Sequence, residues 1–546
     1  MPNSRRKRAR ASSRTAAAPL LPGNGPASRW LPAALAALIV VAGAWAYATS
    51  FRGVFALDDV RAIVRNETIR SLWPLPGPLA PPGRSTVAGR PIANLSFAIN
   101  YAFAAGAATP ATETPARPAP LDPAPFHAGN LVIHLLAAVT LFGVARRTLL
   151  SPPLAAGFGR AAPWLAGAVA LLWVVHPLTT AAVTYVVQRV ESLMSLFYLL
   201  VVYCSIRVGE GRRAGWWTAA AIASCALGMA TKEIMVTAPL VAAAWWWLFG
   251  GPLDASNRRR AARLMAGLCA TWVVFVLLVA GERRGPSVDL SGSATWAYLL
   301  AQAEVVVHYL RLSIWPSPLV FLYDWPLGSS LAAVFWQATL LAGLVGLTAY
   351  GMARRYPASF LGVVFFLILA PSSSVIPIVT EVAAEHRMYL PLAAVITAVV
   401  CAAFLVGRRL VPSRTAGLAA GAVAVVACSG LLAAETRDRN RLYGSAESLW
   451  ADTVAKRPND SRPRVAYGEA LMDAGRPADA QSQLEAAIAM SPDDPAARLR
   501  MAVVLARQGR LADALRHAER ALALRPEDPD ARRLVSQLQK AIAGAR

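Results

Sequence analysis

Hydrophobic residues gather in long runs along this chain, and short polar stretches separate the runs. A helix of about 20 apolar residues crosses the ~30 Å hydrocarbon core of a bilayer. The pattern therefore predicts an all-α, polytopic membrane domain of about 11 transmembrane helices. The runs lie near residues 31–50, 130–147, 162–178, 190–207, 214–231, 235–250, 263–281, 331–352, 358–376, 389–407 and 415–434.

After about residue 435 a regular period replaces the apolar runs. Pro458, Pro492 and Pro526 are spaced by 34 residues each, and Gly475 and Gly509 repeat with the same offset. A 34-residue period with Gly between two helices and Pro after the second is typical of tetratricopeptide repeats. We expect an α-solenoid of about two and a half repeats, closed by a helix near 529–543, that binds a peptide or protein partner.

The chain thus divides into a basic, disordered N-terminus (1–30), a multi-span membrane domain (31–435) and the repeats (436–546). The first apolar run exceeds the 7–15 residues of a typical signal-peptide core, which favours a retained signal anchor over cleavage after Ala48. An outer loop covers residues 51–126 and contains a Pro/Ala/Thr-rich linker at 104–125.

Arginine pairs follow alternate runs, as expected if those loops stay in the cytoplasm. This predicts a multi-pass plasma (inner) membrane protein with a cytoplasmic N-terminus and, because the number of spans is odd, an extracytoplasmic repeat tail. It also requires residues 297–314 to stay at the outer face as an interfacial or re-entrant helix. The pairs or triplets are Arg146-Arg147, Arg212-Arg213, Arg258-Arg259-Arg260, Arg354-Arg355 and Arg408-Arg409, whereas Arg283-Arg284 falls on the outer side.

Composition supports a membrane class, since 56% of the 546 residues are hydrophobic and 16% are charged. The net charge of +23 is spread over short Arg clusters without a single basic face, which disfavours nucleic acid as a partner. The Arg and Ala bias is typical of a GC-rich bacterial genome. All 5 cysteines lie in apolar stretches without metal-ligand spacing, so neither a disulfide framework nor a metal site is predicted.

Asp58 and Asp59 follow the first span and are the first candidates for chemistry. Adjacent carboxylates repel, which raises one pKa and favours proton acceptance from a hydroxyl. The alternative is that one Asp caps a short helix over residues 60–66.

A second group of polar residues occurs at the ends of several apolar runs, on the same predicted side. Ionisable groups at such positions mark a binding site, a pathway or an internal ion pair, and for any one residue a snorkelling or structural role is the simpler interpretation. Their convergence favours a lining for an anionic lipid headgroup. The candidates are Arg90, His127, His134, Arg189, Lys232, Glu233, Glu385, His386, Arg387 and Tyr389.

The order of these motifs resembles that of the transmembrane and tetratricopeptide-repeat O-mannosyltransferases, over roughly residues 30–435 and the repeat tail. The tail is shorter than in eukaryotic members of that family. The motifs are Asp58 to Asn66, Arg90-Pro91-Ile92 with Ser96 to Tyr101, Phe126 to His134, His176 to Val183, Gln188 to Glu191, Thr231-Lys232-Glu233, His308 to Pro316 and Ala384 to Pro391.

This resemblance implies a C-type glycosyltransferase that passes a sugar, mannose by the family name, from a polyprenyl-phosphate carrier to a protein Ser/Thr or an envelope glycan. It implies inversion at the sugar, with Asp58 or Asp59 as base. The donor phosphate would be met by Lys232, Arg189, His386 and Arg387. Glu233, Arg90, His127, His134, Glu385 and Tyr389 would line the site.

No cofactor is required by this chemistry, because side chains can meet a single phosphate, and a divalent metal such as Mg²⁺ is possible but unsupported. Two other functions stay open. A non-catalytic scaffold would use the repeats to recruit envelope proteins, and a lipid or sugar transporter would place polar groups near the middle of the membrane on broken helices. The bend expected around Thr231 to Pro239 fits the transporter.

Overall fold

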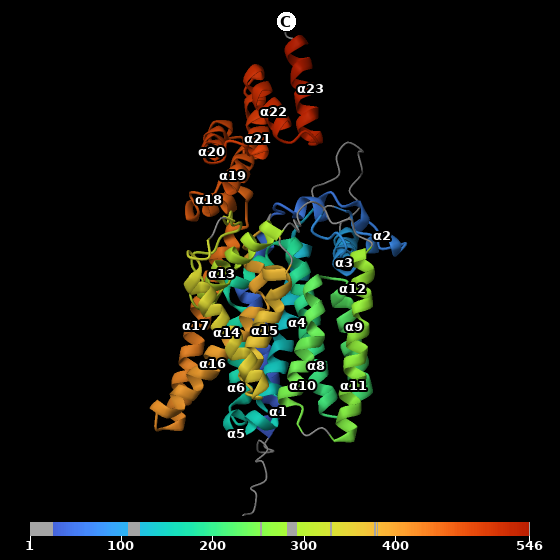
Figure 1. The fold of residues 1–546 in the computed structure, drawn as a ribbon, viewed down its shortest axis with the longest axis vertical. Coiled ribbons are helices and arrows are strands. Elements are labelled where there is room, and N and C mark those ends of the chain that lie inside the picture. Colours follow the sequence, from blue (N-terminus) through green and yellow to red (C-terminus); the bar gives the residue numbers. More distant parts are fainter. Residues whose placement is uncertain are drawn as a thin grey trace, which may run out of the picture.

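The computed structural model describes residues 26–83, 85–107, 121–251, 254–280, 292–327, 330–375, 378 and 381–544. This part of the chain is helical and contains no strand, as predicted (Figure 1). The predictions for most of the N-terminus, most of the 104–125 linker and Arg283-Arg284 lie outside it.

Helices α1 to α17 build the membrane half, and each predicted apolar run coincides with one of them or, for 263–281, with a consecutive pair. They are α1 (Pro26–Tyr47), α2 (Pro76–Leu79), α3 (Pro91–Ala107), α4 (Ala124–Leu149), α5 (Pro152–Phe158), α6 (Ala162–Val174), α7 (Thr180–Val183), α8 (Arg189–Gly209), α9 (Ala214–Met229), α10 (Ala238–Phe249), α11 (Ala255–Ala270), α12 (Trp272–Ala280), α13 (Gly292–Ile314), α14 (Phe335–Ala353), α15 (Ser359–Ala370), α16 (Pro391–Leu410) and α17 (Arg414–Leu442).

Six helices of the described chain are long and apolar enough to cross a membrane, or seven if the bent pair α5 and α6, which turns through 93°, is one span. Three shorter apolar helices, Ala214–Met229, Glu233–Phe249 and Ser359–Ser373, accompany them. On α17, Val423 and Leu431 are 69% and 70% exposed, which suits contact with lipid. The chain is therefore a membrane protein, and length and composition alone count fewer spans than the eleven predicted.

The predicted arginine loops meet at one end of the bundle, opposite the repeats (Figure 1). Arg147 pairs with Glu210 at 2.9 Å, joining the end of α4 to the end of α8. Arg408, at the end of α16, donates to the Gly157 carbonyl at 2.7 Å. We call this end of the bundle the arginine end, and the other the repeat end.

At the repeat end, several helices begin with a proline that follows an irregular turn. Pro91 begins α3 and Pro391 begins α16, while Pro239 stands in the first turn of α10. Proline fits the first helical turn because its missing N–H has no partner there in any case. The turns carry the polar candidates, and the break between α9 and α10 is the bend predicted around Thr231 to Pro239.

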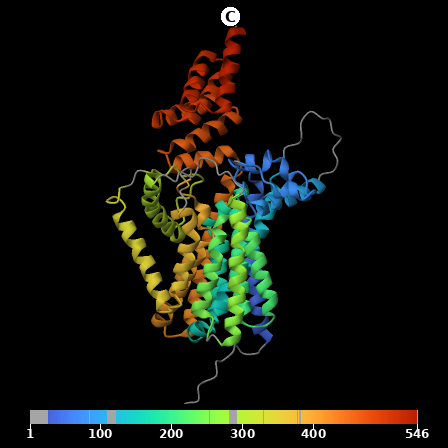
Figure 2. The same cartoon turned by 45° about the vertical axis from the view of Figure 1, so that its right-hand side comes forward.

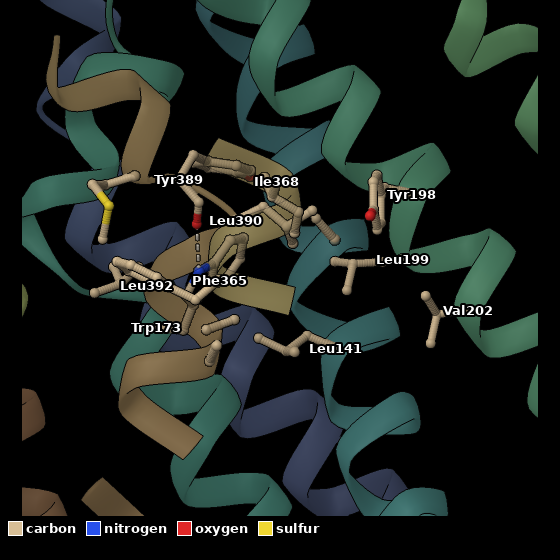
Figure 3. Close-up of a cluster of buried hydrophobic side chains, with 14 of the residues drawn as sticks. Leu141, Trp173, Tyr198, Leu199, Val202, Phe365, Ile368, Tyr389, Leu390 and Leu392 are labelled. Carbon is tan, nitrogen blue, oxygen red and sulfur yellow. Dashed lines mark hydrogen bonds between the residues drawn. The ribbon is translucent and has the colours of Figure 1, made fainter. Parts of the chain in front are cut away.

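The turn before α16 is anchored in the apolar core of the bundle. Trp173 of α6 donates its indole N–H to the Tyr389 carbonyl at 2.8 Å, and Leu141 of α4 and Phe365 of α15 lie in the same cluster (Figure 3). On the other side, Tyr309 of α13 donates to the Ala384 carbonyl at 2.9 Å. Helix α13 lies near the repeat end in both ribbon views, where the interfacial helix was predicted (Figures 1 and 2).

The tail forms paired helices with the predicted 34-residue period, rising from the repeat end (Figure 2). In each repeat an arginine of the first helix donates to the carbonyl of the preceding proline, which fixes the turn that enters the helix. The helices are α18 (Ala446–Lys456), α19 (Ser461–Asp473), α20 (Pro477–Met490), α21 (Pro495–Arg507), α22 (Leu511–Leu524) and α23 (Pro529–Gly544). The pairs are Arg464 and Pro458, Arg498 and Pro492, and Arg532 and Pro526, at 2.8, 2.8 and 2.9 Å.

Gly509 turns the chain between α21 and α22 with a φ of +79°, and a Cβ there would meet nothing within 4 Å. Replacing Gly509 by Ala is therefore expected to cost only the backbone strain of a left-handed residue, about 1–2 kcal/mol. Thermal unfolding of the purified protein in detergent measures this loss. Gly430→Ala, the same change on a helix with open space around it, is the control. Equal stability of the two variants would contradict the prediction.

Candidate functional site

Asp58 is an exposed carboxylate at the repeat end, just beyond α1. Its Oδ2 accepts a hydrogen bond from the Thr86 hydroxyl at 3.0 Å, and its backbone N–H donates to the Tyr185 hydroxyl at 3.0 Å. The hydrogen bond from Thr86 thus orients one carboxylate oxygen of Asp58, while the carboxylate stays accessible to solvent. Such a carboxylate can accept a proton from a bound hydroxyl.

Asp59 has the opposite environment, because its side chain is fully buried. Its Oδ2 accepts the Ala56 N–H at 3.0 Å and its Oδ1 accepts the Val187 N–H at 2.7 Å, which ties the loop after α1 to the turn just before α8. Burial raises the pKa of Asp59 to about 8, against the effect of these hydrogen bonds. The short helix at Val60–Val64 exists, but Asp59 does not cap it through its side chain.

A line of contacts leads from Asp58 to the basic candidates. Thr86, which donates to Asp58, accepts from Arg90 Nη1 through its carbonyl at 2.7 Å. Nη2 of Arg90 then contacts both carboxylate oxygens of Glu233 at 3.1 Å. Arg90 and Glu233 keep 21% and 25% of their side chains exposed, so this ion pair borders solvent.

Lys232 stands beside Glu233 in the extended turn between α9 and α10. Its ammonium forms an ion pair with Glu191 of α8, and both side chains are buried, at 8% and 0% exposure. Among the residues that the structure describes, the second carboxylate oxygen of Glu191 has no hydrogen-bond partner. Buried charges are expensive unless paired, so the two groups depend on one another.

His386 and Glu381 complete this region, with His386 Nε2 4.0 Å from Glu381 Oε2. Burial lowers the pKa of His386, and the nearby charges of Lys232, Arg387 and Arg90 lower it further, so the imidazole is neutral at pH 7. Burial raises the pKa of Glu381, while Arg387 opposes this rise, Asp58 adds to it and Lys232 opposes it.

We call the group formed by Asp58, Arg90, Glu191, Lys232, Glu233, Glu381 and His386 the polar cluster. Sequence reasoning did not single out Glu381, and it placed Glu191 among the polar residues at the ends of the apolar runs without assigning it a role in the site. Glu191 was visible within the motif from Gln188, and Glu381 stands only a few residues before the Ala384 motif. Neither sequence position indicated which cation the carboxylate of Glu191 or of Glu381 would contact.

Arg189 was predicted to bind the donor phosphate, but its guanidinium contacts groups of the protein itself. It is buried, and its guanidinium donates to the Asn130 side chain and to the carbonyls of Ser96 and Phe126, the last two at 3.1 and 2.8 Å. It also lies over the Phe97 ring at 4.5 Å. All three guanidinium nitrogens are occupied by the protein, so Arg189 joins α3, α4 and α8.

Arg387 is also committed to the protein. It donates to the Val382 carbonyl at 3.1 Å, to the Glu381 carbonyl and to the Tyr298 hydroxyl at 3.3 Å. These contacts shape the turn that carries Glu381 and His386. The geometry therefore makes Arg387 a support of the polar cluster, in place of the predicted direct contact with phosphate.

The remaining candidates also make packing contacts away from the polar cluster. His127 contacts the Gly53 carbonyl at 3.2 Å, and His134 contacts the Tyr389 hydroxyl at 2.8 Å. Glu385 pairs with Arg439 of α17. Among the residues predicted to line the site, Arg90 and Glu233 lie in the polar cluster. The contacts of His127, His134, Tyr389 and Glu385 join neighbouring elements of the fold.

The polar cluster combines an accessible carboxylate with cations that are partly shielded from solvent. Such an arrangement can remove a proton at one point and stabilise developing negative charge at another. Within the residues that the structure describes, no three His, Cys, Asp or Glu side chains gather as metal ligands.

Comparison with known proteins connects this geometry to a family. A tetratricopeptide-repeat family model matches residues 471–538. Protein O-mannosyl-transferase Tmtc2 of Drosophila melanogaster is 29% identical over 299 residues, which cover 51% of this chain and 29% of the fly protein. Human protein O-mannosyl-transferase TMTC1 is 24% identical over 509 residues, which cover 82% of this chain and 54% of the human one.

Mouse protein O-mannosyl-transferase TMTC4 is 24% identical over 485 residues, covering 79% of this chain and 63% of the mouse protein. The chain is similar in sequence to the transmembrane and tetratricopeptide-repeat O-mannosyltransferases. The resemblance seen in the motifs is thereby confirmed. The chain spans less than two thirds of the length of these relatives, between 29% and 63%.

Proposed function

We propose that this protein is a membrane glycosyltransferase that moves a sugar, mannose by analogy with its relatives, from a polyprenyl-phosphate carrier to a protein Ser/Thr or an envelope glycan. The observation that carries the proposal is the contact path from Asp58 through Thr86 to Arg90 and Glu233. It brings one accessible carboxylate and several cations to the same end of the bundle. Relatives named protein O-mannosyl-transferases support the same reaction class.

In the proposed step, the oxygen of the acceptor hydroxyl attacks the anomeric carbon of the sugar, and Asp58 accepts the proton of that hydroxyl. The bond between that carbon and the phosphate oxygen breaks, and the lipid phosphate leaves with the electron pair. Attack opposite the leaving group inverts the anomeric centre. Lys232 and Arg90 are the cations of the polar cluster best suited to the phosphate, since Arg189 and Arg387 each donate three hydrogen bonds within the protein.

The proposal does not require a divalent metal, because a single phosphate carries a charge that side chains can meet. Asp59 is not suited to the role of base. It is buried, and its raised pKa of about 8 keeps it largely protonated at neutral pH. The repeats, which rise beside the polar cluster, would hold a peptide segment of the acceptor or of a partner protein.

We further propose that the arginine end faces the cytoplasm of an inner membrane and that the polar cluster and the repeats face outward. The arginine loops at one end of the bundle support this orientation, because positive charge is retained in the cytoplasm. A reporter active only in the cytoplasm, fused after Arg546, is expected to be silent. The same reporter placed in the α10–α11 loop should be active, and the reverse pair of results would overturn the orientation.

The transferase proposal is tested in cells that lack the gene and in cells in which it is restored. We expect loss of one class of O-linked glycan on envelope proteins, together with accumulation of the lipid-linked sugar, and recovery of both on restoration. Rescue by the repeats fused to an unrelated single span would instead favour the scaffold. A transporter is disfavoured because the polar cluster lies at the ends of helices. Five of its residues are in the turns before α3, α10 and α16, Asp58 follows α1, and Glu191 is in the first turn of α8.

A further inference from the structure

Residues 319–325, which we call the bridging segment, lie between the polar cluster and the repeats. On the membrane side, the Val320 N–H and the Tyr323 hydroxyl donate to Glu385 Oε1 at 2.7 and 2.9 Å. Glu385 directly precedes His386. The bridging segment is therefore fixed to the turn that carries part of the polar cluster.

The first repeat helices hold the bridging segment from the other side. The Lys456 ammonium of α18 donates to the Leu319 carbonyl at 3.1 Å, and the Asp324 N–H donates to Asp460 at 3.1 Å. Leu322 packs in one apolar cluster with Trp450 of α18 and Ala470 of α19. A flexible attachment of the repeats would not need these polar and apolar contacts, so the first repeat helices are packed firmly against the bridging segment.

Phe321, in the middle of the bridging segment, connects the two sides through its ring. Its centroid lies 4.9 Å from that of Tyr185 and 5.1 Å from that of Trp450, both in edge-to-face geometry. Tyr185 is buried, and its hydroxyl accepts the backbone N–H of Asp58 at 3.0 Å. Edge-to-face pairs of this kind are favourable beyond the burial of the rings.

We propose that Phe321 is a positioning residue for Asp58 and that it makes the first repeat helix part of the catalytic architecture. Trp450 supports Phe321, Phe321 holds the Tyr185 ring, and the Tyr185 hydroxyl fixes the backbone of Asp58. The repeats would thus set the position of the base, in addition to any role in binding a partner. This inference rests on the proposed function only where it predicts a change in the rate of sugar transfer. The contacts themselves can be tested without measuring that rate.

The first test is hydrogen exchange in the purified full-length protein, measured on peptides that cover residues 54–64. Phe321→Ala is expected to accelerate exchange of the Asp58 amide at least tenfold, because the Tyr185 hydroxyl loses its support. Trp450→Ala should have the same effect to a smaller degree. Phe335→Ala, which removes a 66% exposed ring on α14, is the matched control and should leave these peptides unchanged. Unchanged exchange in Phe321→Ala would overturn the inference whether or not the protein is a transferase.

The second test uses initial rates of sugar transfer by folded protein in proteoliposomes. Phe321→Ala is expected to lower kcat at least tenfold with an unchanged KM for the polyprenyl-phosphate donor, and Phe321→Trp should restore most of the rate. In a Tyr185→Phe background the Phe321→Ala change should cost little more, because both act through the same hydrogen bond. A lower melting temperature with unchanged kcat, or additive losses in the double variant, would reduce Phe321 to a packing role. No transfer by the unmodified protein would refute the proposed function, while the exchange result would still stand.

Discussion

Replacing Asp58 by Asn is expected to lower kcat for sugar transfer by about 10²–10⁴-fold, the contribution of a positioned general base. Asn preserves the shape of the side chain and can still accept the Thr86 hydrogen bond through its amide oxygen, but it cannot accept a proton. Because Asp58 is exposed, the variant should fold with the stability of the unmodified protein. Rates measured on purified protein with a polyprenyl-phosphate sugar donor give the result, and a rate within a few-fold of normal would exclude Asp58 as the base.

Asp59→Asn is the matched comparison, because it makes the same chemical change one residue later. Asp59 accepts two backbone N–H groups, and an amide oxygen can replace only one of its carboxylate oxygens. The buried N–H left without a partner costs about 1–3 kcal/mol. We therefore expect Asp59→Asn to reduce the yield and thermal stability of the protein far more than Asp58→Asn does.

The second large effect is expected at the Lys232–Glu191 pair. Lys232→Met leaves the Glu191 carboxylate buried without its partner, and breaking a buried ion pair in this way costs about 3–5 kcal/mol. Adding Glu191→Gln removes the orphan charge, so the double variant should regain most of the lost stability. If Lys232 meets the donor phosphate, the double variant will still transfer sugar about 10²–10³-fold more slowly than the unmodified protein, as for loss of one preorganised donor.

A pair at the arginine end provides the control for this experiment. Arg147 and Glu210 contact at 2.9 Å on the far side of the bundle, and the double change Arg147→Met with Glu210→Gln also removes one positive and one negative charge. This control should transfer normally. A Lys232→Met, Glu191→Gln protein that folds and transfers at the normal rate would show that Lys232 serves structure alone.

The parts of the fold that depend on local pattern were predictable from the sequence. The repeats recur every 34 residues because each pair of helices needs the same turn, made by Gly475 or Gly509 with φ of +75° and +79°. The apolar runs predicted the membrane helices for a similar reason, since length and hydropathy are properties of a continuous segment. The count of spans was less secure, because α10 and α15 are short and α5 and α6 form a sharp bend.

The candidate site was predictable as a region but not in its pairings. Asp58 and Asp59 are adjacent in sequence, and only the structure shows that Asp59 is the enclosed one, with the Val187 N–H as one of its partners. Arg189 and Lys232 are both cations at helix ends, yet Arg189 donates to Asn130 and to two backbone carbonyls, whereas Lys232 pairs with Glu191, which lies 41 residues away in the chain. Such differences depend on tertiary contacts that carry no local sequence signal.

Transfer of radiolabelled mannose from a polyprenyl-phosphate donor to protein, in proteoliposomes of the purified full-length chain with the Asp58→Asn protein as its matched blank, tests the central claim most directly. We predict that label enters protein with the unmodified chain, that the new linkage has the opposite anomeric configuration to the donor, and that the Asp58→Asn protein transfers at least 100-fold less, as expected for loss of a general base. Equal labelling by both proteins, or a product that retains the donor configuration, would contradict the account.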